Sequence, residues 1–478
     1  KTILNVASDT IQTVTFVDAV PTLINLKGTG GVETSVVKFK VLGSTGAPMK
    51  NVDLDFSLST SIGGLNLTNI TAKTDKTGNA TTTVQAGSIS TTVRVTAKAK
   101  GTEISTQSSQ LIVSTGVPDQ NSMSLSASEL FPLGAWDYDG IESDITIRMA
   151  DAFNNPPPNG TAVTFTTEGG SIKSGCPTTD GACVVKWTSQ APRPTRNSPI
   201  NTPARKLCVD DSTGIRLPAP DYLACLLERA GRITILATAI GNESFIDVNG
   251  NGYFDKTTDI FRSYNDGGDC GANVPPSSAK TPANSGVIPC DDLVEAYLDK
   301  NENKQRDSDE EITDFNKDDQ HTIENGMYNG VLCQTEGNGC TKTGVNIRDD
   351  ILIIMGSTKM LTRSEVFPYL ETSVELTPTV DPNAPDSKLI WFWMSDENGH
   401  GLPAGTTLDL AEGNLKNATA TIGLKGPIAE SADPIRVFVS ITAADTGIPN
   451  GTFNINISIP TPKGRVIVTQ TVSVSPDI

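Results

Sequence analysis

The chain has 478 residues, of which 37% are hydrophobic and 5% aromatic, and its formal net charge is −18. This length allows two to four domains with sizeable cores, and the negative charge argues against nucleic acid and anionic membranes as partners. No stretch is apolar over the length that a membrane span needs, so we expect no direct span in this chain.

The first segment, residues 1–18, holds a strand-like run, TIQTVTFV, at residues 10–17. A linker follows at residues 18–21, and the run has no sandwich of its own before it. We therefore expect residues 1–18 to be the orphan closing strand of a preceding repeat, or a strand donated to a neighbouring molecule. Strand donation repeated head to tail would build a fibre.

Residues 19–116 form the first copy of an internal repeat. Val52, Leu54, Phe56 and Leu58 alternate along one predicted strand, as in a strand with one buried face. Further strands are expected at residues 36–42, 80–86, 92–97 and 110–114, with a Thr-Asp-x-x-Gly turn at residues 74–78.

Residues 117–356 repeat this order. Ile145, Ile147 and Met149 alternate, a second Thr-Asp turn begins at Thr179, and the closing strand is expected at residues 345–355. Two insertions interrupt the copy, at about residues 190–230 and 242–344. A structureless loop as long as the second one is rare in a compact domain, so it needs staples or a ligand to order it.

Residues 357–478 form a third, divergent copy. Its strongest strand is LIWFWM at residues 389–394, and later strands are expected at residues 436–443, 453–459 and 465–474. The predicted fold is all-β: tandem immunoglobulin-like β-sandwich domains, the middle one with a long, disulfide-stapled, acidic insertion.

The copies share an order of elements: a strand, a turn rich in Asn, Gly and Pro, a Val-x-Phe strand, a Thr-Asp turn, and an alternating strand that ends near Gly101 or Gly241. This order resembles the group 1 bacterial Ig-like domains, the repeats of invasin and intimin-type surface proteins. The resemblance is good over residues 20–114 and over the matching strands of residues 119–356. It implies a bacterial surface protein whose partners are neighbouring Ig-like domains, further copies of itself, or a host or cell-surface ligand.

Eight cysteines lie in close pairs along the chain, and no CxxC motif is present. This pattern favours disulfide bonds over zinc and places the protein outside the cytosol. Proximity suggests the pairs Cys176–Cys183, Cys208–Cys225, Cys270–Cys290 and Cys333–Cys340, although the connectivity stays open at this stage.

Three acid-rich runs inside residues 242–344 have the alternating oxygen side chains of calcium loops. Tyr253 is expected to offer its carbonyl oxygen to the first run, and Glu295 to reach the third run from a short helix at residues 291–298. Hard oxygen ligands suit calcium, which would also offset the repulsion among the carboxylates. The expected ligands are Asp247, Asn249, Asn251, Tyr253, Asp255, Asp259, Glu295, Asp299, Asn301, Asn303, Asp307, Glu310, Asp314, Asn316 and Asp318.

We expect no enzyme activity from this chain. His321 and His400 are its two histidines; neither has a convincing nucleophile nearby in the sequence, and no nucleophile elbow is present. Trp187, Trp391 and Trp393 fall in predicted strands, where a core position is more common than a sugar platform.

The leading hypothesis is a non-catalytic extracellular protein of the bacterial surface. It would be a calcium-stiffened rod of Ig-like domains with a structural or adhesive role, which polymerises by strand exchange if residues 1–18 are donated. The alternatives are a ligand- or glycan-binding module at the tip of an adhesin, or the accessory domains of a secreted enzyme.

Overall fold

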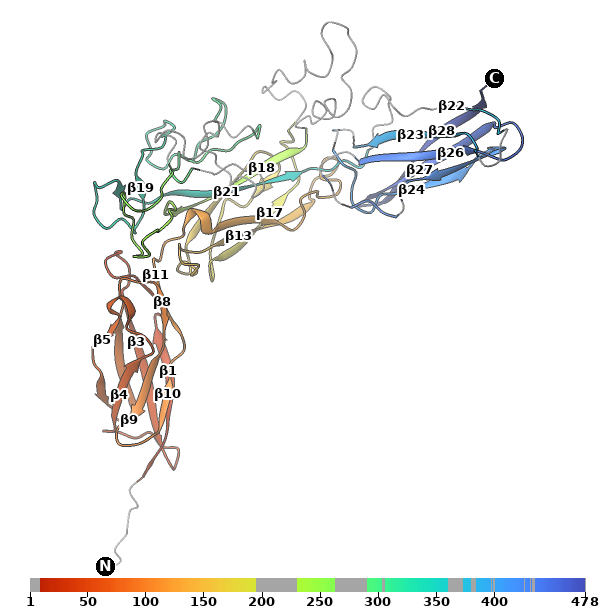
Figure 1. The fold of residues 1–478 in the computed structure, drawn as a ribbon. Helices are drawn as coiled ribbons and strands as arrows, with labels where there is room; N and C mark the ends of the chain where they lie inside the picture. Colours follow the sequence, from red (N-terminus) through yellow and green to blue (C-terminus); the bar gives the residue numbers. More distant parts are fainter. Residues whose placement is uncertain are drawn as a thin grey trace, which may run out of the picture.

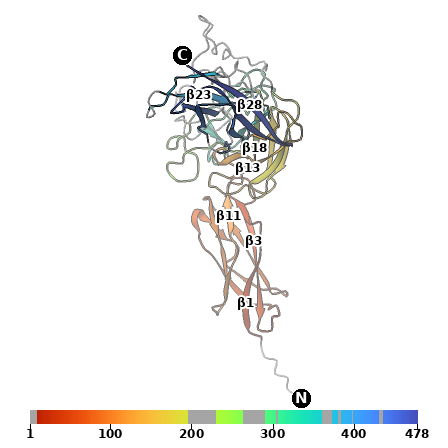
Figure 2. The same cartoon turned by 90° about the vertical axis from the view of Figure 1, so that its right-hand side faces the viewer.

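The computed structural model describes residues 9–194, 230–262, 290–302, 306–359, 373–379, 384–396, 398, 400–424, 426–429, 431 and 435–477. Within these residues the chain is all-β apart from two short 3₁₀ turns, at Ile62–Gly64 and Gln120–Ser122. The strands form three two-layer units that follow one another end to end, with the termini at opposite ends of the molecule (Figure 1). The view in Figure 2 looks nearly along units 2 and 3, and unit 1 still projects away from them.

Unit 1 contains strands β1 to β11. Its first sheet has the order β1-β3-β7-β5, built from Ile11–Val20, Thr34–Gly43, Asn79–Gln85 and Asn66–Leu67. A second sheet has the order β10-β9-β4-β6, built from Ser105–Gln107, Val95–Ala99, Asp53–Leu58 and Thr71–Lys73. A third has the order β2-β11-β8, built from Leu23–Asn25, Leu111–Ser114 and Thr91–Val93. The alternating apolar residues meet between the layers, where the rings of Phe39 and Phe56 lie 5.8 Å apart.

The expectation of an orphan closing strand near the N-terminus is wrong for residues 11–20, whereas donation of this strand to a neighbouring molecule stays a prediction. These residues form β1, which pairs antiparallel with β3 of the same unit, and Phe16 lies opposite Phe39. Val14 and Ala19 are buried in the core of unit 1. The strand therefore completes unit 1 itself.

Unit 2 contains two four-stranded sheets. One has the order β12-β13-β17-β15, built from Met123–Ala127, Glu142–Met149, Ala182–Thr188 and Ser171–Ile172. The other has the order β16-β14-β18-β21, built from Gly175–Pro177, Ala162–Thr167, Arg232–Gly241 and Val345–Ile354. Trp187 is fully buried between the sheets, as predicted, and its Nε1–H donates to the carbonyl of Gly169 at 2.9 Å. The predicted closing strand is β21.

The Thr-Asp turns of units 1 and 2 need glycine for a shared reason. Gly78 and Gly181 have φ angles of 78° and 74°, which side chains disfavour. A Cβ atom at Gly78 would lie 2.8 Å from the carbonyl oxygen of Val41 in β3, and one at Gly181 would lie 2.4 Å from that of Met149 in β13. The turn thus packs against the strand before it in both copies.

Unit 3 has one sheet in the order β22-β28-β27-β24, built from Ser373–Leu376, Gly464–Pro476, Gly451–Thr461 and Thr407–Glu412. The other has the order β23-β26-β25, built from Ser387–Met394, Ile435–Ala443 and Ala418–Ile422. All the predicted strands of the third copy are present. Trp391, however, faces outward and is 38% exposed, with the Arg436 guanidinium 4.3 Å from its ring centre.

Candidate functional site

Residues 242–344, named here segment 242–344, connect β18 to β21. The two strands are antiparallel neighbours, and Gly241 pairs with Val345, so the segment leaves and re-enters unit 2 at one place. Its described residues contain only two short strands, β19 (Tyr328–Asn329) and β20 (Cys340–Thr341), which pair in parallel. The backbone amides of such a segment need other acceptors, and buried carboxylates supply many of them.

An aromatic cluster anchors the segment. Phe245, Phe254, Phe261 and Tyr328 form edge-on or tilted ring pairs with centroid distances of 5.0 to 6.1 Å. These residues and the Cys333–Cys340 disulfide belong to the same hydrophobic cluster as the core of unit 1. The segment therefore packs at the junction of units 1 and 2.

The first acid-rich run is a closed loop between Ile246 and Ile260, which form an isolated β-bridge. Asp247 accepts the N–H groups of two glycines, at positions 250 and 252, at 2.7 and 2.8 Å. Asp255 accepts the side-chain amides of Asn249 and Asn251 at 2.8 and 2.7 Å. Asp259 accepts from Val248 N and Asp255 N, and Asn251 accepts from Tyr253 N. The predicted ligands of this run thus lie in one loop.

The second run is more deeply buried. Glu310 is 3% exposed and accepts the N–H groups of Lys300 and Asp307, at 2.8 and 2.9 Å. Burial raises the pKa of its carboxyl group. Asn301 donates its side-chain amide to Asp307, and the carbonyl of buried Asp299 accepts from Thr234 in β18. Asn303 lies outside the described residues.

The third run folds around Glu295. Glu295 accepts Phe315 N and Thr322 N at 2.9 Å each, and so ties together the two ends of the run. Within the run Asp314 accepts from Lys317 N and Asp319 N. Asn316 accepts from Asp318 N and donates to the Asp318 carboxylate. Glu295 thus lies beside the third run, and its role as a metal ligand stays a prediction. Residues 291–298 are not a helix in the structure.

Further buried carboxylates, which sequence reasoning missed, order the same segment. Glu243 accepts from Leu293 N and Asn329 N at 2.8 and 2.7 Å, and Asp292 accepts from Gly326 N at 2.7 Å. Asp119, in the linker between units 1 and 2, accepts the Ser244 hydroxyl at 2.6 Å. Burial raises the pKa of Asp119 and of Asp291 to about 6 each, and that of Glu243 well above its ordinary value. Single acids outside a repeating pattern carry no sequence signal of burial.

Arg348 is the buried cation of this region. It is 1% exposed, and its Nη1 donates to the carbonyl oxygens of Val294 and Asn346. Burial lowers its pKa to about 10, so it stays charged at neutral pH. The side-chain amide of Gln120 bonds the N–H and the carbonyl of Arg348 at 2.9 and 2.8 Å. Gln120 thus occupies the backbone hydrogen-bonding groups of edge strand β21 that a neighbouring strand would otherwise use.

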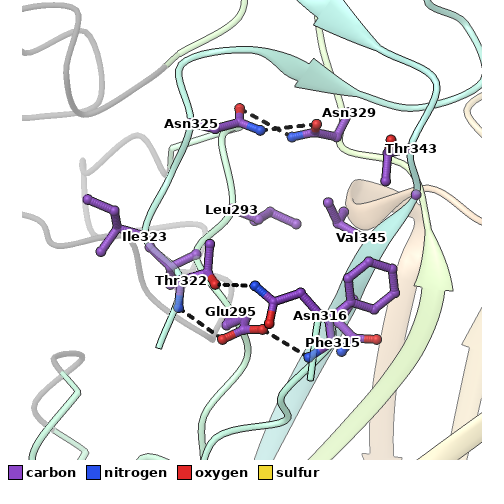
Figure 3. A pocket seen from close by; sticks show the side chains of 13 residues that line it. Leu293, Glu295, Phe315, Asn316, Thr322, Ile323, Asn325, Asn329, Thr343 and Val345 are labelled. Atoms are coloured by element: carbon purple, nitrogen blue, oxygen red, sulfur yellow. Dashed lines mark hydrogen bonds between the residues drawn. The ribbon is translucent and has the colours of Figure 1, made fainter. Parts of the chain in front are cut away.

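A pocket of about 230 Å³ opens beside the third run (Figure 3). Figure 3 shows the side chains of Leu293 and Val345 facing each other across it, with Phe315 near Val345. The hydrogen-bonded amides of Asn325 and Asn329 lie at another side. The lining is therefore apolar at its centre with amide and hydroxyl groups around it.

The three runs fit calcium in donor chemistry, since every predicted side-chain ligand offers an oxygen. Among the described residues, however, no group of three or more His, Cys, Asp or Glu side chains is gathered closely enough to hold a metal ion. The carboxylates accept N–H groups instead. Calcium therefore stays a prediction.

The predicted disulfides Cys176–Cys183 and Cys333–Cys340 are confirmed. Cys290 is also disulfide-bonded, whereas its proposed partner Cys270 and the proposed pair Cys208–Cys225 lie outside the described residues, as does most of the insertion at 190–230.

His321 donates to the carbonyl of Glu295 at 3.2 Å. In the described part of the chain, no helix has the length and hydropathy needed to cross a membrane.

No protein-family model and no curated protein matches the chain. Among solved structures, the adhesin FdeC of Escherichia coli is 11% identical, with 98% of this chain and 99% of that one covered and a TM-score of 0.31. InvD of Yersinia pseudotuberculosis is 14% identical over 96% and 97% of the two chains, with a TM-score of 0.29. Invasin, described as a bacterial integrin-binding protein, is 11% identical over 97% of this chain and 60% of its own, with a TM-score of 0.26.

Fragments of intimin are also similar, the D0-D1 pair being 19% identical over 48% of this chain with a TM-score of 0.21. Structural neighbours of the chain are thus Ig-like bacterial adhesins of the invasin, intimin and FdeC type, the group that the repeat pattern resembles.

Proposed function

We propose that this chain is a non-catalytic, extracellular part of a bacterial surface adhesin, in which tandem Ig-like domains form a rod that displays segment 242–344. The observation that carries the proposal is the end-to-end series of three two-layer units, with the described residues of segment 242–344 lying outside the sheets of the middle unit (Figure 1). The disulfides support an oxidising, extracellular location. A segment displayed by rigid β-units is a usual place for binding residues.

The test is adhesion with and without the segment. Because Gly241 pairs with Val345, an Asn-Gly turn can replace residues 242–344 and close β18 and β21 as a two-residue hairpin. We expect the fluorescently labelled intact chain to bind epithelial cells and the shortened chain to lose that binding. Equal binding by both chains would show that the segment is not the adhesive face.

Calcium in segment 242–344 is a finer part of the proposal. The clustering of oxygen side chains in the first and second runs supports it, and a cation would offset their repulsion. We expect chelation with EDTA to lower the melting temperature and to speed proteolytic cleavage within the segment. Asp247→Ala should weaken this response by removing the contribution of the first run, whereas Asp75→Asn, in an exposed turn of unit 1, should leave it unchanged. Identical cleavage with and without EDTA in the intact chain would contradict the calcium proposal.

Polymerisation by strand exchange also remains a proposal. β1 already pairs with β3 in its own unit, so exchange would require β1 to leave and a copy from another molecule to replace it. Negative-stain electron microscopy distinguishes long fibres from single rods, and rods at all protein concentrations would contradict polymerisation.

The pocket of Figure 3 favours a second candidate function, the binding of a small neutral ligand such as one sugar residue of a glycan. An apolar floor and a rim of amides suit the apolar face and hydroxyl groups of a sugar. Thr343→Trp would block the exposed rim without entering a core, and Thr421→Trp, at an exposed position of β25, is the matched control. Binding on a glycan array that only Thr343→Trp removes would support this function; no array signal from the intact chain would contradict it.

A further inference from the structure

Two turns at the joints between units have the same hydrogen-bond pattern. One follows β13 in unit 2 and begins at Asp151; the other follows β23 in unit 3 and begins at Asp396. Both aspartates are 0% exposed. In each turn the aspartate N–H donates to the carbonyl four residues later, Asn155 or His400, at 2.8 and 2.7 Å. The turns are therefore equivalent positions of the repeat.

In the first joint, one carboxylate oxygen of Asp151 accepts hydrogen bonds from the turn, and the other accepts one from the preceding unit. Oδ1 of Asp151 accepts Phe153 N and Asn155 N at 2.9 and 2.8 Å. Oδ2 accepts Thr115 N at 3.0 Å. Thr115 directly follows β11, the last strand of unit 1, and is fully buried.

The two carboxylate oxygens of Asp396 have the same kinds of partner at the second joint. Oδ1 of Asp396 accepts Asn398 N and His400 N at 2.8 and 3.0 Å. Oδ2 accepts Ser357 N at 3.0 Å, just beyond β21, the last strand of unit 2. Ser357 is also fully buried.

The fifth residue of each turn adds a second contact to the preceding unit. The side-chain amide of Asn155 donates to Ser90 Oγ at 3.0 Å, in the loop between β7 and β8. Nε2–H of His400 donates to the carbonyl of Ala230 at 2.6 Å, two residues before β18. These two loops occupy corresponding places in units 1 and 2. Both contacts of the first joint therefore recur at the second joint.

Unit 1 carries the same turn with a different residue. Gly43 N donates to the Ala47 carbonyl at 2.9 Å, so Gly43 stands where Asp151 and Asp396 stand. A Cβ atom at Gly43 would lie 2.0 Å from the Asp9 carboxylate, which accepts the hydroxyls of Ser44 and Thr45. A carboxylate from the residues before β1 thus occupies the corresponding place in unit 1.

We propose that Asp151 and Asp396 are equivalent joint residues, each of which binds the exit of the preceding unit's last strand and fixes the orientation of successive units. A turn that was merely local would resemble the one at Asp75. There one oxygen accepts Thr77 N and Asn79 N at 2.7 and 3.0 Å, but the side chain is exposed and contacts only its own unit. The inference goes beyond the proposed adhesive function and does not depend on calcium.

Asp→Asn substitutions at these two positions distinguish the hydrogen bonds within the turn from the contact between units. The remaining Oδ1 of asparagine can still accept both turn N–H groups, whereas Nδ2 replaces Oδ2 and faces the N–H of Thr115 or Ser357, so donor meets donor. The turn is kept and the contact between units is lost. Asn155→Ala and His400→Ala provide milder variants, which leave both aspartates in place.

The experiment measures distances between spin labels by pulsed electron resonance. Labels are placed on unnatural amino acids at exposed residues 81, 184 and 421, so that the disulfides stay intact. We expect Asp151→Asn to broaden the 81–184 distance distribution at least about twofold and to leave 184–421 unchanged. Asp396→Asn should do the reverse, and the alanine variants should broaden the same distances less. The measurements are made in calcium and in EDTA.

The control is Asp75→Asn, which should leave both distributions as in the intact chain. Unchanged distributions in both joint variants would overturn the proposal, as would equal broadening by Asp75→Asn, which would indicate general loosening. Because the readout needs neither cells nor a ligand, a failure of adhesion leaves this test unaffected.

Discussion

Asp119 couples the stability of the joint between units 1 and 2 to pH. Asp119 is 5% exposed, and its Oδ1 accepts hydrogen bonds from Ser244 Oγ and Asn121 N at 2.6 and 3.0 Å. Burial raises its pKa from 3.8 to about 6 in spite of these bonds. Asp119→Asn would keep an oxygen for both donors and remove the charge.

The direction and size of the change in the free energy of unfolding follow from the shift in the pKa of Asp119. Between about pH 4 and 6 the folded protein holds a proton on Asp119 that the unfolded chain has lost, so stability falls as pH rises through this range and levels off above it. A shift of about two pKa units corresponds to roughly 3 kcal/mol. We therefore expect Asp119→Asn to be more stable than the intact chain by up to about 3 kcal/mol at neutral pH. The two should converge below about pH 4.

The local stability around Asp119 is measured by unfolding the chain in urea and following pulsed hydrogen exchange in peptides from β12. A local measurement is needed because a chain of several units does not unfold in a two-state transition. The matched control is Asp144→Asn, an exposed residue of β13 whose ion pair with Lys186 should contribute little. Parallel pH profiles of stability for Asp119→Asn and the intact chain would contradict a raised pKa of Asp119, as would a variant that is less stable at neutral pH.

Two further predictions concern segment 242–344. Glu295→Ala leaves the Phe315 and Thr322 amides without their carboxylate, so the third run should lose roughly 3 kcal/mol of local stability; unchanged hydrogen exchange there would contradict this. Replacing both Cys333 and Cys340 by Ser removes a bridge with a sequence separation of seven, which should destabilise the segment by about 2 to 3 kcal/mol. A protease cleavage rate equal to that of the intact chain would argue against it.

The sequence predicts most of the β-framework because a half-buried strand alternates with period two. Leu54 to Leu58 and Ile145 to Met149 lie in β4 and β13, where strands are predicted, with the apolar residues facing the cores. The three acid-rich runs likewise fold as compact loops, because alternating Asp and Asn side chains accept nearby backbone N–H groups. These are local patterns, which one stretch of sequence displays by itself.

Non-local features were harder to predict. Residues 11–20 are a strand as expected, but the choice of β3 as its partner depends on residues far along the chain. Trp391 lies in its predicted strand yet faces outward, because its neighbours Ile390 and Phe392 occupy the core face. Arg348 and Glu243 look like ordinary surface residues in the sequence, and their burial results from segment 242–344 folding back over β21.

Cell binding by the intact chain and by the chain in which an Asn-Gly turn replaces segment 242–344 tests the adhesive role of the segment. Labelled proteins are applied to epithelial cells and quantified by flow cytometry, after calorimetry has shown that unit 3 still melts as in the intact chain and circular dichroism that the shortened chain keeps its β-structure. We expect saturable binding by the intact chain and its loss in the shortened one. Equal binding by the two, or no binding by either, would contradict an adhesive role for the segment.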